Sequence, residues 1–433
     1  MSREKRILLD IAGQVDPVSV KDYVSKGGYR ALRRAADMEG NAIIDELCAS
    51  GLLGRGGAGF PTGRKWRTLW GVMDEPKYIV CNADEGEPGT YKDRELLRQV
   101  PLKVVEGMTI AARTFGAKKG YIFVRGEYLN IVGALNHALE NAREAGYLGK
   151  NILGRSGFDF DIAVVTGASS YVCGEETALL NTIEGNRGEP RLRPPYPAEK
   201  GLYGKPTLVN NAETFANVTL ILDKGASWFT SLGTESGHGT KLLSIAGHSK
   251  QRGVFEVELG SVTLKDILYG EDFGAGTSTG RQVKFFHLGG QSGYVGFPEQ
   301  MFTPYDYGAL NMVGLTIGSG AFVVMDDSVC LVDYCRKVAE FFVGESCGKC
   351  SACRIGTVHM LKLLTDLAGG RGMPGDIDRL EEMANAVSRL SACGLGQASG
   401  KAITSCLRHR RDEFIAHVQG NCPARFCKMA EVD

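Results

Sequence analysis

Apolar residues near the N-terminus recur at helical spacing. Leu32 and Ala36 lie one helical turn apart, as do Ile43 and Leu47, before the chain reaches Gly51. Side chains one turn apart share a face of a helix, and a glycine commonly follows the end of one. This pattern predicts short helices whose apolar faces contribute to packing.

Farther along, short apolar runs alternate with helical patterns. The runs at 78–80, 121–124 and 162–165 are continuous, whereas Leu135 and Leu139 recur at helical spacing between two of them. Continuous apolar runs are typical of strands buried on both faces of a sheet. Their alternation with helices predicts a layered α/β domain.

The pattern changes again after residue 239. Short strand signals at 241–245, 254–257 and 284–288 are separated by glycine-rich turns and by one short helical segment at 264–268. A small α+β module fits this order of elements. From residue 331 helical periodicity returns and cysteines become frequent.

A chain of 433 residues is too long for one ordinary hydrophobic core, so several domains are expected. The changes of pattern divide the chain into an α/β domain with N-terminal helices at 1–238, a small α+β domain at 239–330 and a helical domain at 331–433. The last of these ends in a short segment that contains cysteine and histidine.

Composition narrows the function classes. Hydrophobic residues make up 43% and charged residues 23%, which is globular composition. No apolar stretch of about 18 residues could span a bilayer, and the apolar run after the basic N-terminus is too short for a signal peptide. Fifty basic and fifty acidic residues cancel, so nothing favours nucleic acid. The expectation is a cytoplasmic protein without membrane insertion, whose twelve cysteines are reduced and available as ligands.

The first candidate site is a glycine-rich loop. Four glycines lie within the six positions 54–59, so backbone N–H groups can approach a phosphate, while Arg55 and Lys65 supply positive charge. The loop follows a helical segment and lacks the context of the dinucleotide fingerprint. An anion cradle and a flexible turn are both compatible with this segment alone.

A cluster of polar residues follows the first apolar run. Asn82, Asp84, Glu85 and Glu87 lie at the carboxyl end of the expected strand, where α/β sheets usually bind ligands. Carboxylates accept hydrogen bonds from ribose hydroxyls, and an amide can bond the polar edge of a flavin. The alternative is a solvated acidic loop.

Two further polar segments and one proline-rich segment complete the set. The segments at 171–177 and 210–214 carry paired carboxylates and paired amides, and the prolines of 190–197 stiffen a loop that presents Arg193 and Tyr196. Each segment alone is a weak signal. Together they could form the walls of a pocket.

The cysteines give the strongest signal. Cys347, Cys350 and Cys353 form a C-x2-C-x2-C run, and Cys393 offers a distant fourth thiolate. Three closely spaced cysteines and a remote fourth are typical of a [4Fe–4S] cluster. Zinc is the alternative, since it also accepts four thiolates.

A second ligand set lies near the C-terminus. Cys406, His417, Cys422 and Cys427 could close a tetrahedral Cys3His zinc site, with His409 as a spare imidazole. A second iron–sulfur centre and free reduced cysteines remain the alternatives. The cysteines without ligand spacing are expected to be buried small side chains: Cys48, Cys81, Cys173, Cys330 and Cys335.

Six segments occur in an order that carries a resemblance: GRGGAGFPTGRKW, NADEGEPGTYKDR, YVCGEETAL, PRLRPPYP, GLYGKPTLVNNAET and ESCGKCSACRIGT. Over about residues 20–420 the chain resembles the NADH-binding flavoprotein subunit of respiratory complex I. It is equally similar to the related diaphorase (beta) subunits of NAD-linked [FeFe]-hydrogenases and formate dehydrogenases. The resemblance implies a Rossmann-like FMN/NADH-binding domain, a ubiquitin-like β-grasp domain and a helical [4Fe–4S] domain.

The resemblance also implies residue roles. The FMN site would comprise Gly54, Arg55, Gly56, Gly57, Ala58, Gly59, Lys65, Asn82, Asp84, Glu85, Tyr171, Gly174, Glu175, Asn210, Asn211 and Thr214. Phe60 would stack on NADH, Glu87 and Glu176 would contact the nucleotide, and Arg193 and Tyr196 would line the same cleft. Members of the family commonly carry Lys and Phe at the last two positions. They also carry an adenine-stacking aromatic residue where this chain has Thr68, so adenine stacking is in doubt.

The implied function is hydride exchange between NAD(H) and FMN, without a catalytic protein group, followed by single-electron transfer to the [4Fe–4S] cluster. The implied partners are a small [2Fe–2S] thioredoxin-like subunit and a larger iron–sulfur or catalytic subunit of a hydrogenase, formate dehydrogenase or complex I-like assembly. Two alternatives stay open. One is an electron-wiring subunit that uses flavin with ferredoxin or hydrogenase partners, and the other is an iron–sulfur scaffold that binds no nucleotide.

Overall fold

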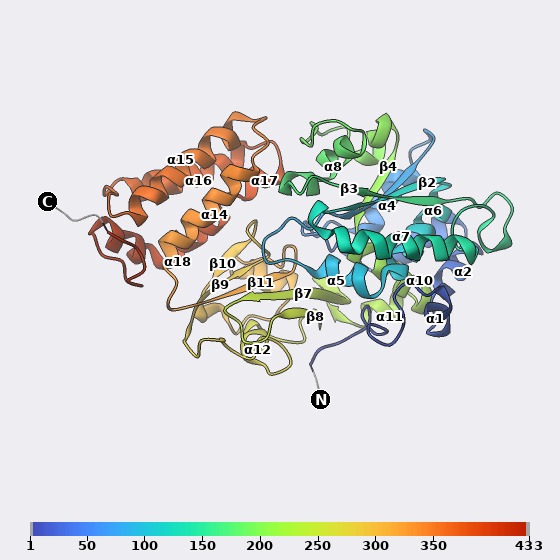
Figure 1. Ribbon diagram of the computed structural model, residues 1–433, viewed down its shortest axis with the longest axis horizontal. Coiled ribbons are helices and arrows are strands. Elements are labelled where there is room, and N and C mark those ends of the chain that lie inside the picture. The colour runs from blue at the N-terminus through green and yellow to red at the C-terminus, as the bar shows by residue number, and fades with distance from the viewer. Residues whose placement is uncertain (1–2, 430–433) are drawn as a thin grey trace. The chain divides into compact units, whose positions relative to one another are not determined.

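The computed structural model describes residues 3–429, which form two compact units (Figure 1). The first unit contains the chain up to Gly86, together with Tyr91–Leu242 and Glu256–Ser261. The second contains Glu87–Thr90, Leu243–Phe255 and the chain from Val262. The change of unit after residue 242 lies close to the expected boundary at 238, and the finer division at residue 330 stays a prediction.

Helices and four main strands build the first unit. The helices are α1 Val20–Ser25, α2 Arg30–Ala36, α3 Gly40–Ala49, α4 Thr62–Trp70, α5 Lys92–Gln99, α6 Pro101–Phe115, α7 Leu129–Glu144, α8 Glu176–Ile183, α9 Pro197–Lys200, α10 Ala212–Lys224 and α11 Ala226–Thr230. Short 3-10 turns are η1 Gly126–Tyr128, η2 Ile152–Gly154, η3 Tyr171–Gly174 and η4 Leu202–Gly204. The strands are β1 Tyr78–Ala83, β2 Lys119–Val124, β3 Asp161–Thr166 and β4 Thr207–Asn211, with the short hairpin β5 Gly233–Thr234 and β6 Gly237–His238.

The four main strands form a parallel sheet in the order β3-β2-β1-β4. This is the order of the first four strands of a doubly wound Rossmann sheet. The register aligns Val80 of β1 with Tyr121 of β2 and Val209 of β4. Helices α6 and α10 lie against β1, and α7 lies against β3. The predicted strands and the layered α/β domain are therefore confirmed.

Local sequence explains where the central helices of this unit begin and end. Pro101 opens α6, where its missing N–H costs nothing, and Gly116 follows the helix with φ 69°. Asn211 caps α10 by accepting a hydrogen bond from the backbone N–H of Glu213. Since Asn211 is also the last residue of β4, this cap places its side chain at the carboxyl end of the sheet.

A five-stranded mixed sheet in the order β10-β9-β11-β7-β8 lies mostly in the second unit, whereas the start of β7 up to Leu242 and the end of β8 from Glu256 belong to the first. Its strands are β7 Thr240–Gly247, β8 Gly253–Glu258, β9 Val283–Leu288, β10 Tyr294–Gly296 and β11 Ala321–Asp326. Strand β11 runs parallel to β7 and antiparallel to β9. The helix α12 Leu264–Tyr269 follows β8, and η5 Pro298–Gln300 and α13 Tyr307–Met312 precede β11. The hairpins β9–β10 and β7–β8 lie at the two edges of this sheet, and the parallel pair β7 and β11 joins them at its centre. This is the expected topology of a β-grasp.

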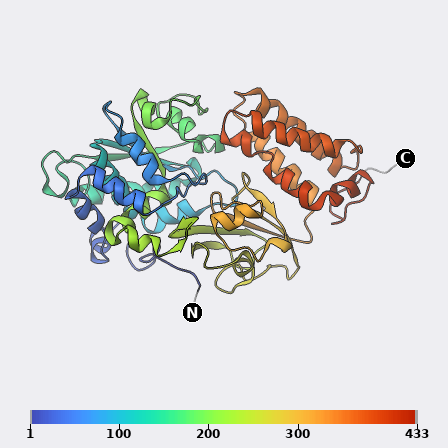
Figure 2. The ribbon, with the colours of Figure 1, turned by 180° about the vertical axis from the view of Figure 1, so that it is seen from behind.

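Helices form the rest of the second unit. They are α14 Leu331–Glu345, α15 Ser351–Ala368, α16 Asp376–Leu390, α17 Gly394–Ala398 and α18 Lys401–Val418. Contacts of α14 with α15 and α18, and of α16 with the same two helices, make a compact bundle that both views show (Figures 1 and 2). Within residues 3–429, none of the helices has the length and apolar composition needed to cross a membrane.

Candidate functional site

The glycine-rich loop at 54–60 is held in a tight turn in the first unit. The N–H of Gly54 donates to the Phe60 carbonyl at 2.8 Å. Gly57 and Gly59 have φ values of 129° and 63°, which only glycine adopts readily. The expected loop is therefore a defined backbone turn, and two of its glycines are required by its geometry.

The outer side of this loop offers unused donors. Over residues 3–429, the backbone N–H groups of Gly56, Gly57 and Ala58 donate to no protein acceptor. On the inner side, a Cβ added to Gly56 would lie 3.0 Å from the Asn211 Cβ. Successive free N–H groups on a glycine turn form an anion-binding concavity. The donor set therefore fits a phosphate.

Arg55 faces the interior. Its side chain is fully buried, its backbone N–H donates to Thr214 Oγ1 at 2.9 Å, and its Nη2 donates to the His238 carbonyl at 2.6 Å. In the described chain, its Nε and Nη1 have no hydrogen-bond partner. The guanidinium lies close enough to Glu213 and Lys241 to shift the pKa of each downward, although burial is the largest influence on both. Arg55 thus anchors the loop and adds buried positive charge, and its guanidinium is not exposed on the loop.

Residues from three of the predicted segments meet at Glu176. One carboxylate oxygen accepts from Lys65 Nζ at 3.1 Å and the other from Arg193 Nη1 at 3.1 Å. Lys65 also donates to the Val209 carbonyl at 3.1 Å. Glu175 caps α8 through the backbone N–H groups of its first turn. The result is a Lys–Glu–Arg cluster at the carboxyl end of the parallel sheet.

The predicted amide residues bridge neighbouring strand ends. Asn82 Nδ2 donates to the Gly174 carbonyl at 2.7 Å, and its Oδ1 accepts from the Asp84 N–H at 3.1 Å. Asn210, with its amide oriented to satisfy its neighbours, accepts from Trp66 Nε1 at 3.0 Å. Asn82 therefore links the end of β1 to the turn after β3, and Asn210 links β4 to α4.

Asn211 uses all of its side-chain hydrogen-bonding capacity within the protein. Its Oδ1 accepts from Lys92 Nζ at 3.2 Å and from the Glu213 N–H at 3.0 Å. Its Nδ2 donates to the Asn82 carbonyl at 3.2 Å and to Asp93 Oδ2 at 2.7 Å. A primary amide offers two donors and two acceptor positions. The side chain of Asn211 is therefore part of the wall that shapes the site.

Glu85 caps a helix. Its carboxylate accepts from the backbone N–H groups of Asp93 and Arg94, at 2.9 and 3.1 Å, and from the Tyr128 hydroxyl at 3.2 Å. These bonds close the first turn of α5. Burial and the neighbouring Asp93 carboxylate raise the pKa of Glu85 to about 7.

Asp84 is buried beside Arg125, whose pKa its charge helps to raise. Tyr171 and Gly174 bound the turn η3, and a Cβ added to Gly174 would lie 3.1 Å from the Asp84 carbonyl. The segment after β1 and the segment after β3 therefore approach each other closely at a glycine.

Two aromatic rings of the first unit are available for stacking. Phe60 is 46% exposed and Tyr196 is 53% exposed, although both are large and partly apolar. The Arg64 guanidinium lies 5.9 Å from the centre of the Phe60 ring. Thr68 donates its hydroxyl hydrogen to the Arg64 carbonyl at 3.1 Å, so its side chain is directed back along the helix.

Glu87 belongs to the second unit. Its carboxylate accepts from the Ser292 N–H at 2.8 Å and from the Ser292 hydroxyl at 2.7 Å. The glycine at 290 accommodates this carboxylate, because a Cβ there would lie 2.1 Å from Glu87 Cγ. Sequence reasoning missed Ser292, which lies 205 residues away and carries no motif.

The four predicted cluster cysteines converge in the helical part of the second unit. Cys350 directly precedes α15 and Cys393 directly precedes α17, so the starts of these helices position both thiols. Burial raises the pKa of Cys353, and the neighbouring thiols of Cys350, Cys393 and Cys347 add to this shift. The donor set is four thiols, which is the set a [4Fe–4S] cluster requires.

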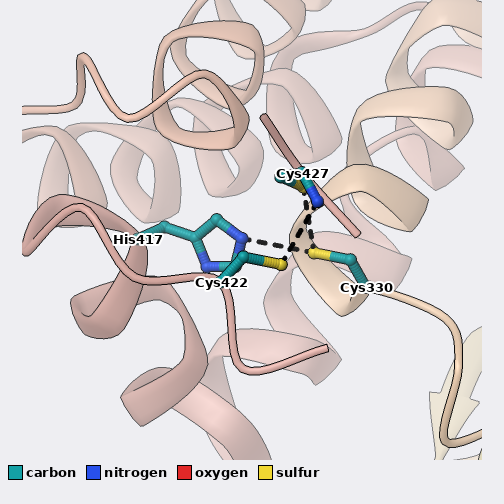
Figure 3. A group of neighbouring side chains, drawn as sticks. All are labelled: Cys330, His417, Cys422 and Cys427. Atoms are coloured by element: carbon teal, nitrogen blue, oxygen red, sulfur yellow. Dashed lines mark hydrogen bonds between the residues drawn. The ribbon is translucent and has the colours of Figure 1, made fainter. Parts of the chain in front are cut away.

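A second group of metal-ligand side chains lies at the end of the same bundle. Cys330, His417, Cys422 and Cys427 place their ligand atoms within 4.8 Å of one another (Figure 3). Cys330 Sγ is 3.2 Å from His417 Nε2 and 3.5 Å from Cys427 Sγ. The hydrogen bonds from Cys427 and His417 lower the pKa of Cys330 to about 4, despite burial. A lowered pKa favours the thiolate, which is the form that metals bind.

The prediction that Cys406 belongs to this ligand group is wrong. Cys406 and His417 both belong to α18, where eleven positions correspond to about 16 Å along the axis, so they cannot share an ion. Cys406 is instead buried beside Cys335, whose hydrogen bond adds to the effect of burial in raising the pKa of Cys406. Cys330, expected to be only a buried small side chain, caps α14 and takes the fourth place in the group.

A parallel sheet of Rossmann order with a glycine turn that fits a phosphate, a β-grasp sheet and a helical bundle that carries four neighbouring thiols are features expected of a flavin- and iron–sulfur-binding oxidoreductase. Comparison with known families agrees. The Nuo51 FMN-binding domain matches residues 47–220, and the NADH-ubiquinone oxidoreductase-F iron-sulfur binding region matches residues 333–417.

Similar proteins cover nearly the whole chain. The NADP-reducing hydrogenase subunit HndC of Solidesulfovibrio fructosivorans is 41% identical over 98% of this chain and 86% of its own length. An NADH-quinone oxidoreductase subunit of Rhizobium meliloti is 41% identical over 93% of this chain and 95% of its own. The NAD⁺-reducing [NiFe]-hydrogenase structure in the H2-reduced state aligns with a TM-score of 0.83 and 33% identity, over 96% of this chain and 68% of that chain.

The chain belongs to the family of NADH-binding FMN and iron–sulfur subunits found in NADH-quinone oxidoreductases and in the related nucleotide-reducing hydrogenases. The predicted family, the FMN and [4Fe–4S] cofactors and the oxidoreductase class acting on NADH are confirmed by this membership.

Proposed function

We propose that the chain exchanges hydride between NAD(H) and FMN and passes single electrons to the [4Fe–4S] cluster. Bound FMN would supply the conversion between a two-electron hydride and one-electron steps. The observations that carry the proposal are the free N–H groups of the glycine loop, which Arg55 anchors to Thr214 of α10, and the Lys65–Glu176–Arg193 cluster. Such an arrangement offers donors and cations to a phosphate and carboxylates to ribose hydroxyls.

In this proposal, different residues of the first unit bind the phosphate, form the flavin pocket and contact the dinucleotide. The N–H groups of Gly56, Gly57 and Ala58, with Lys65, would anchor the FMN phosphate. Asn82, Asp84, Glu85, Tyr171, Gly174, Glu175, Asn210, Asn211 and Thr214 would form the pocket, partly through side chains and partly by fixing its loops. Phe60 would stack on the dinucleotide, with Glu176, Arg193 and Tyr196 lining the cleft.

The second unit would supply the electron acceptor. Cys347, Cys350, Cys353 and Cys393 would hold the [4Fe–4S] cluster, and the helix N-termini at Cys350 and Cys393 would offset part of its negative charge. Glu87, which Ser292 holds in place, stays a predicted contact of the nucleotide.

We also infer that the chain works as a subunit of a cytoplasmic assembly. The relatives are named as subunits of hydrogenase and quinone-reducing enzymes. The proposed partners are a small [2Fe–2S] thioredoxin-like subunit and a larger iron–sulfur or catalytic subunit. Co-purification of these classes with the tagged full chain at stoichiometric amounts would support this, and a chain that purifies alone from its own cells would contradict it.

Replacing Phe60 with alanine is expected to raise the KM for NADH by about tenfold in an assay with an artificial electron acceptor. The expected cause is loss of one aromatic stacking surface, which is worth about 1 kcal/mol or more. FMN content should remain at the wild-type level. Leu129→Ala, which removes another exposed apolar side chain of the first unit, is the matched control and should leave KM unchanged. Equal KM values for all three proteins would contradict the stacking role.

The Cys3His group fits a structural zinc ion, and we propose that it holds one. Tetrahedral zinc with Zn–S near 2.3 Å and Zn–N near 2.0 Å places its ligand atoms about 3.5–3.8 Å apart. The spacings of Cys330 from His417 and Cys427, 3.2 and 3.5 Å, approach this value. His417 Nδ1 lies 2.7 Å from the Glu413 carbonyl, which fixes the ring and leaves Nε2 directed at the group.

Changing Cys422 to serine is expected to reduce zinc from about one ion per chain to near zero, measured by mass spectrometry of the purified full chain. The matched control is Cys406→Ser, because Cys406 lies in the same bundle but outside the ligand group. The control should keep its zinc. Zinc loss in Cys406→Ser with retention in Cys422→Ser would contradict the assignment.

A further inference from the structure

A chain of buried charges lies within the first unit, beneath the residues assigned to FMN. Lys92, Glu213 and Lys241 are all fully buried. Glu213 Oε2 lies 2.5 Å from Lys241 Nζ and 3.0 Å from Lys92 Nζ. These contacts make a Lys–Glu–Lys ladder that water does not reach.

The ladder is continuous with the wall of the site. Lys92 Nζ donates to Asn211 Oδ1 at 3.2 Å, and Asn211 Nδ2 donates to the Asn82 carbonyl at 3.2 Å. Asn82 in turn donates to the Gly174 carbonyl at 2.7 Å. Lys92 is therefore linked by hydrogen bonds to the segments that follow β1, β3 and β4.

Three basic side chains lie among these buried groups, and burial lowers the pKa of one of them, Lys241, to about 7. Lys92 and Lys241 both pair with Glu213, and Lys92 Nζ lies 2.7 Å from Asp93 Oδ1. The buried Arg55 guanidinium adds positive charge near Glu213 without a hydrogen bond to it. Burial opposes the charged form of Lys92, but Asp93 and Glu213 outweigh it and raise the pKa, so Lys92 keeps its proton. Removing one ion from water costs several kcal/mol, and apolar side chains often fill the same space as well or better. A role in packing alone does not explain this many buried charges.

We propose that Lys92 is a positioning residue that holds Asn211 in place and sets positive charge behind the FMN site, so that the protein favours negative charge on the bound flavin. The proposal rests on the assignment of FMN to this sheet edge. Fixed charges in a site without water act strongly on a redox group, because the local dielectric constant is low. The positive charge of Lys92 then raises the midpoint potential of the flavin, and the negative charge of Asp93 lowers it.

Variants at two neighbouring positions that carry opposite charges provide the test. Lys92→Met removes a cation, and Asp93→Asn removes an anion that is bonded to both Lys92 and Asn211. The midpoint potential of FMN is measured by spectroelectrochemistry with mediators on the FMN-loaded full chain. We expect Lys92→Met to weaken binding of reduced relative to oxidised FMN by about tenfold, which lowers the potential by about 30 mV for a two-electron couple. Asp93→Asn should shift the potential in the opposite direction.

Lys103→Met is the matched control. Lys103 is a buried lysine of the same unit, but it bonds the carbonyl groups of Ile7 and Leu8 instead of the site. Its removal should not shift the potential. If Lys92→Met does not fold, Lys92→Gln makes the same charge change with a polar side chain.

Three results would overturn the proposal: midpoint potentials that shift in the same direction in the Lys92 and Asp93 variants, no shift in either variant, or loss of FMN from both. Each would show that the buried charges only build the pocket. Because mediators set the potential, the experiment does not need NADH. Failure of NADH to reduce the wild-type flavin would instead contradict the proposed function.

Discussion

The Cys353→Ala variant is expected to contain no [4Fe–4S] cluster. Cys353 is buried and lies among the thiols of Cys347, Cys350 and Cys393. Three cysteines cannot complete the four-thiolate coordination of the cluster. Iron should fall from about four atoms per chain to background, and the EPR signal of the reduced cluster should disappear.

The same variant should keep its FMN, because the flavin residues belong to the first unit. NADH should still bleach the flavin, although no cluster signal follows. Cys48→Ser is the matched control, since Cys48 is an exposed cysteine of the first unit, contrary to the expectation that it is buried. A wild-type cluster signal in Cys353→Ala would contradict the ligand assignment.

The Gly56→Val variant is expected to lose at least about nine-tenths of its FMN. A Cβ at this position lies 3.0 Å from the Asn211 Cβ, and Asn211 cannot retreat because its amide is bonded on all sides. Overpacking costs about 1–3 kcal/mol, and about 1.4 kcal/mol corresponds to a tenfold loss of affinity. The loop must therefore move, which misplaces its phosphate-binding N–H groups.

FMN released by acid from the purified protein provides the measurement. Gly133→Val is the matched control, because a Cβ at Gly133 on α7 meets no other atom within 4 Å. The control should keep its FMN, and both variants should keep the iron of the second unit. Full FMN content in Gly56→Val would contradict the placement of the phosphate at this loop.

The sheets were predictable from the sequence because their signals are local. Continuous apolar runs such as 121–124 become strands that are buried on both faces, and the alternation with helices fixes a parallel sheet. Cys347, Cys350 and Cys353 were equally clear, since one short segment presents three ligands. In these cases neighbours in sequence are also neighbours in space.

The rest depends on contacts between distant segments. Cys330 joins His417 across 87 positions, and no spacing rule connects them. The distance along α18, in contrast, could have excluded Cys406 once the helix from 401 to 418 was recognised. The helical rise could therefore have shown from the sequence that Cys406 is not a ligand. No sequence pattern, however, identifies Cys330 as the residue that takes its place.

The direction of buried side chains was the other feature that the sequence did not predict. The sequence suggested that Arg55 adds charge to a phosphate loop, whereas its guanidinium is buried beneath that loop. Lys92 and Asp93 lie within a recognised motif, but their bonds to Asn211 depend on the pairing of β1 with β4. Burial and pairing arise from the tertiary fold, so a linear pattern does not determine them.

Anaerobic titration of the purified, FMN-loaded full chain with NADH tests the central claim most directly, with flavin absorbance and cluster EPR followed on the same sample. The account predicts that NADH bleaches the flavin and that a reduced-cluster signal then develops. If a chemical reductant bleaches the flavin but NADH does not, the chain does not oxidise NADH, and a scaffold or a subunit that uses another electron donor takes its place.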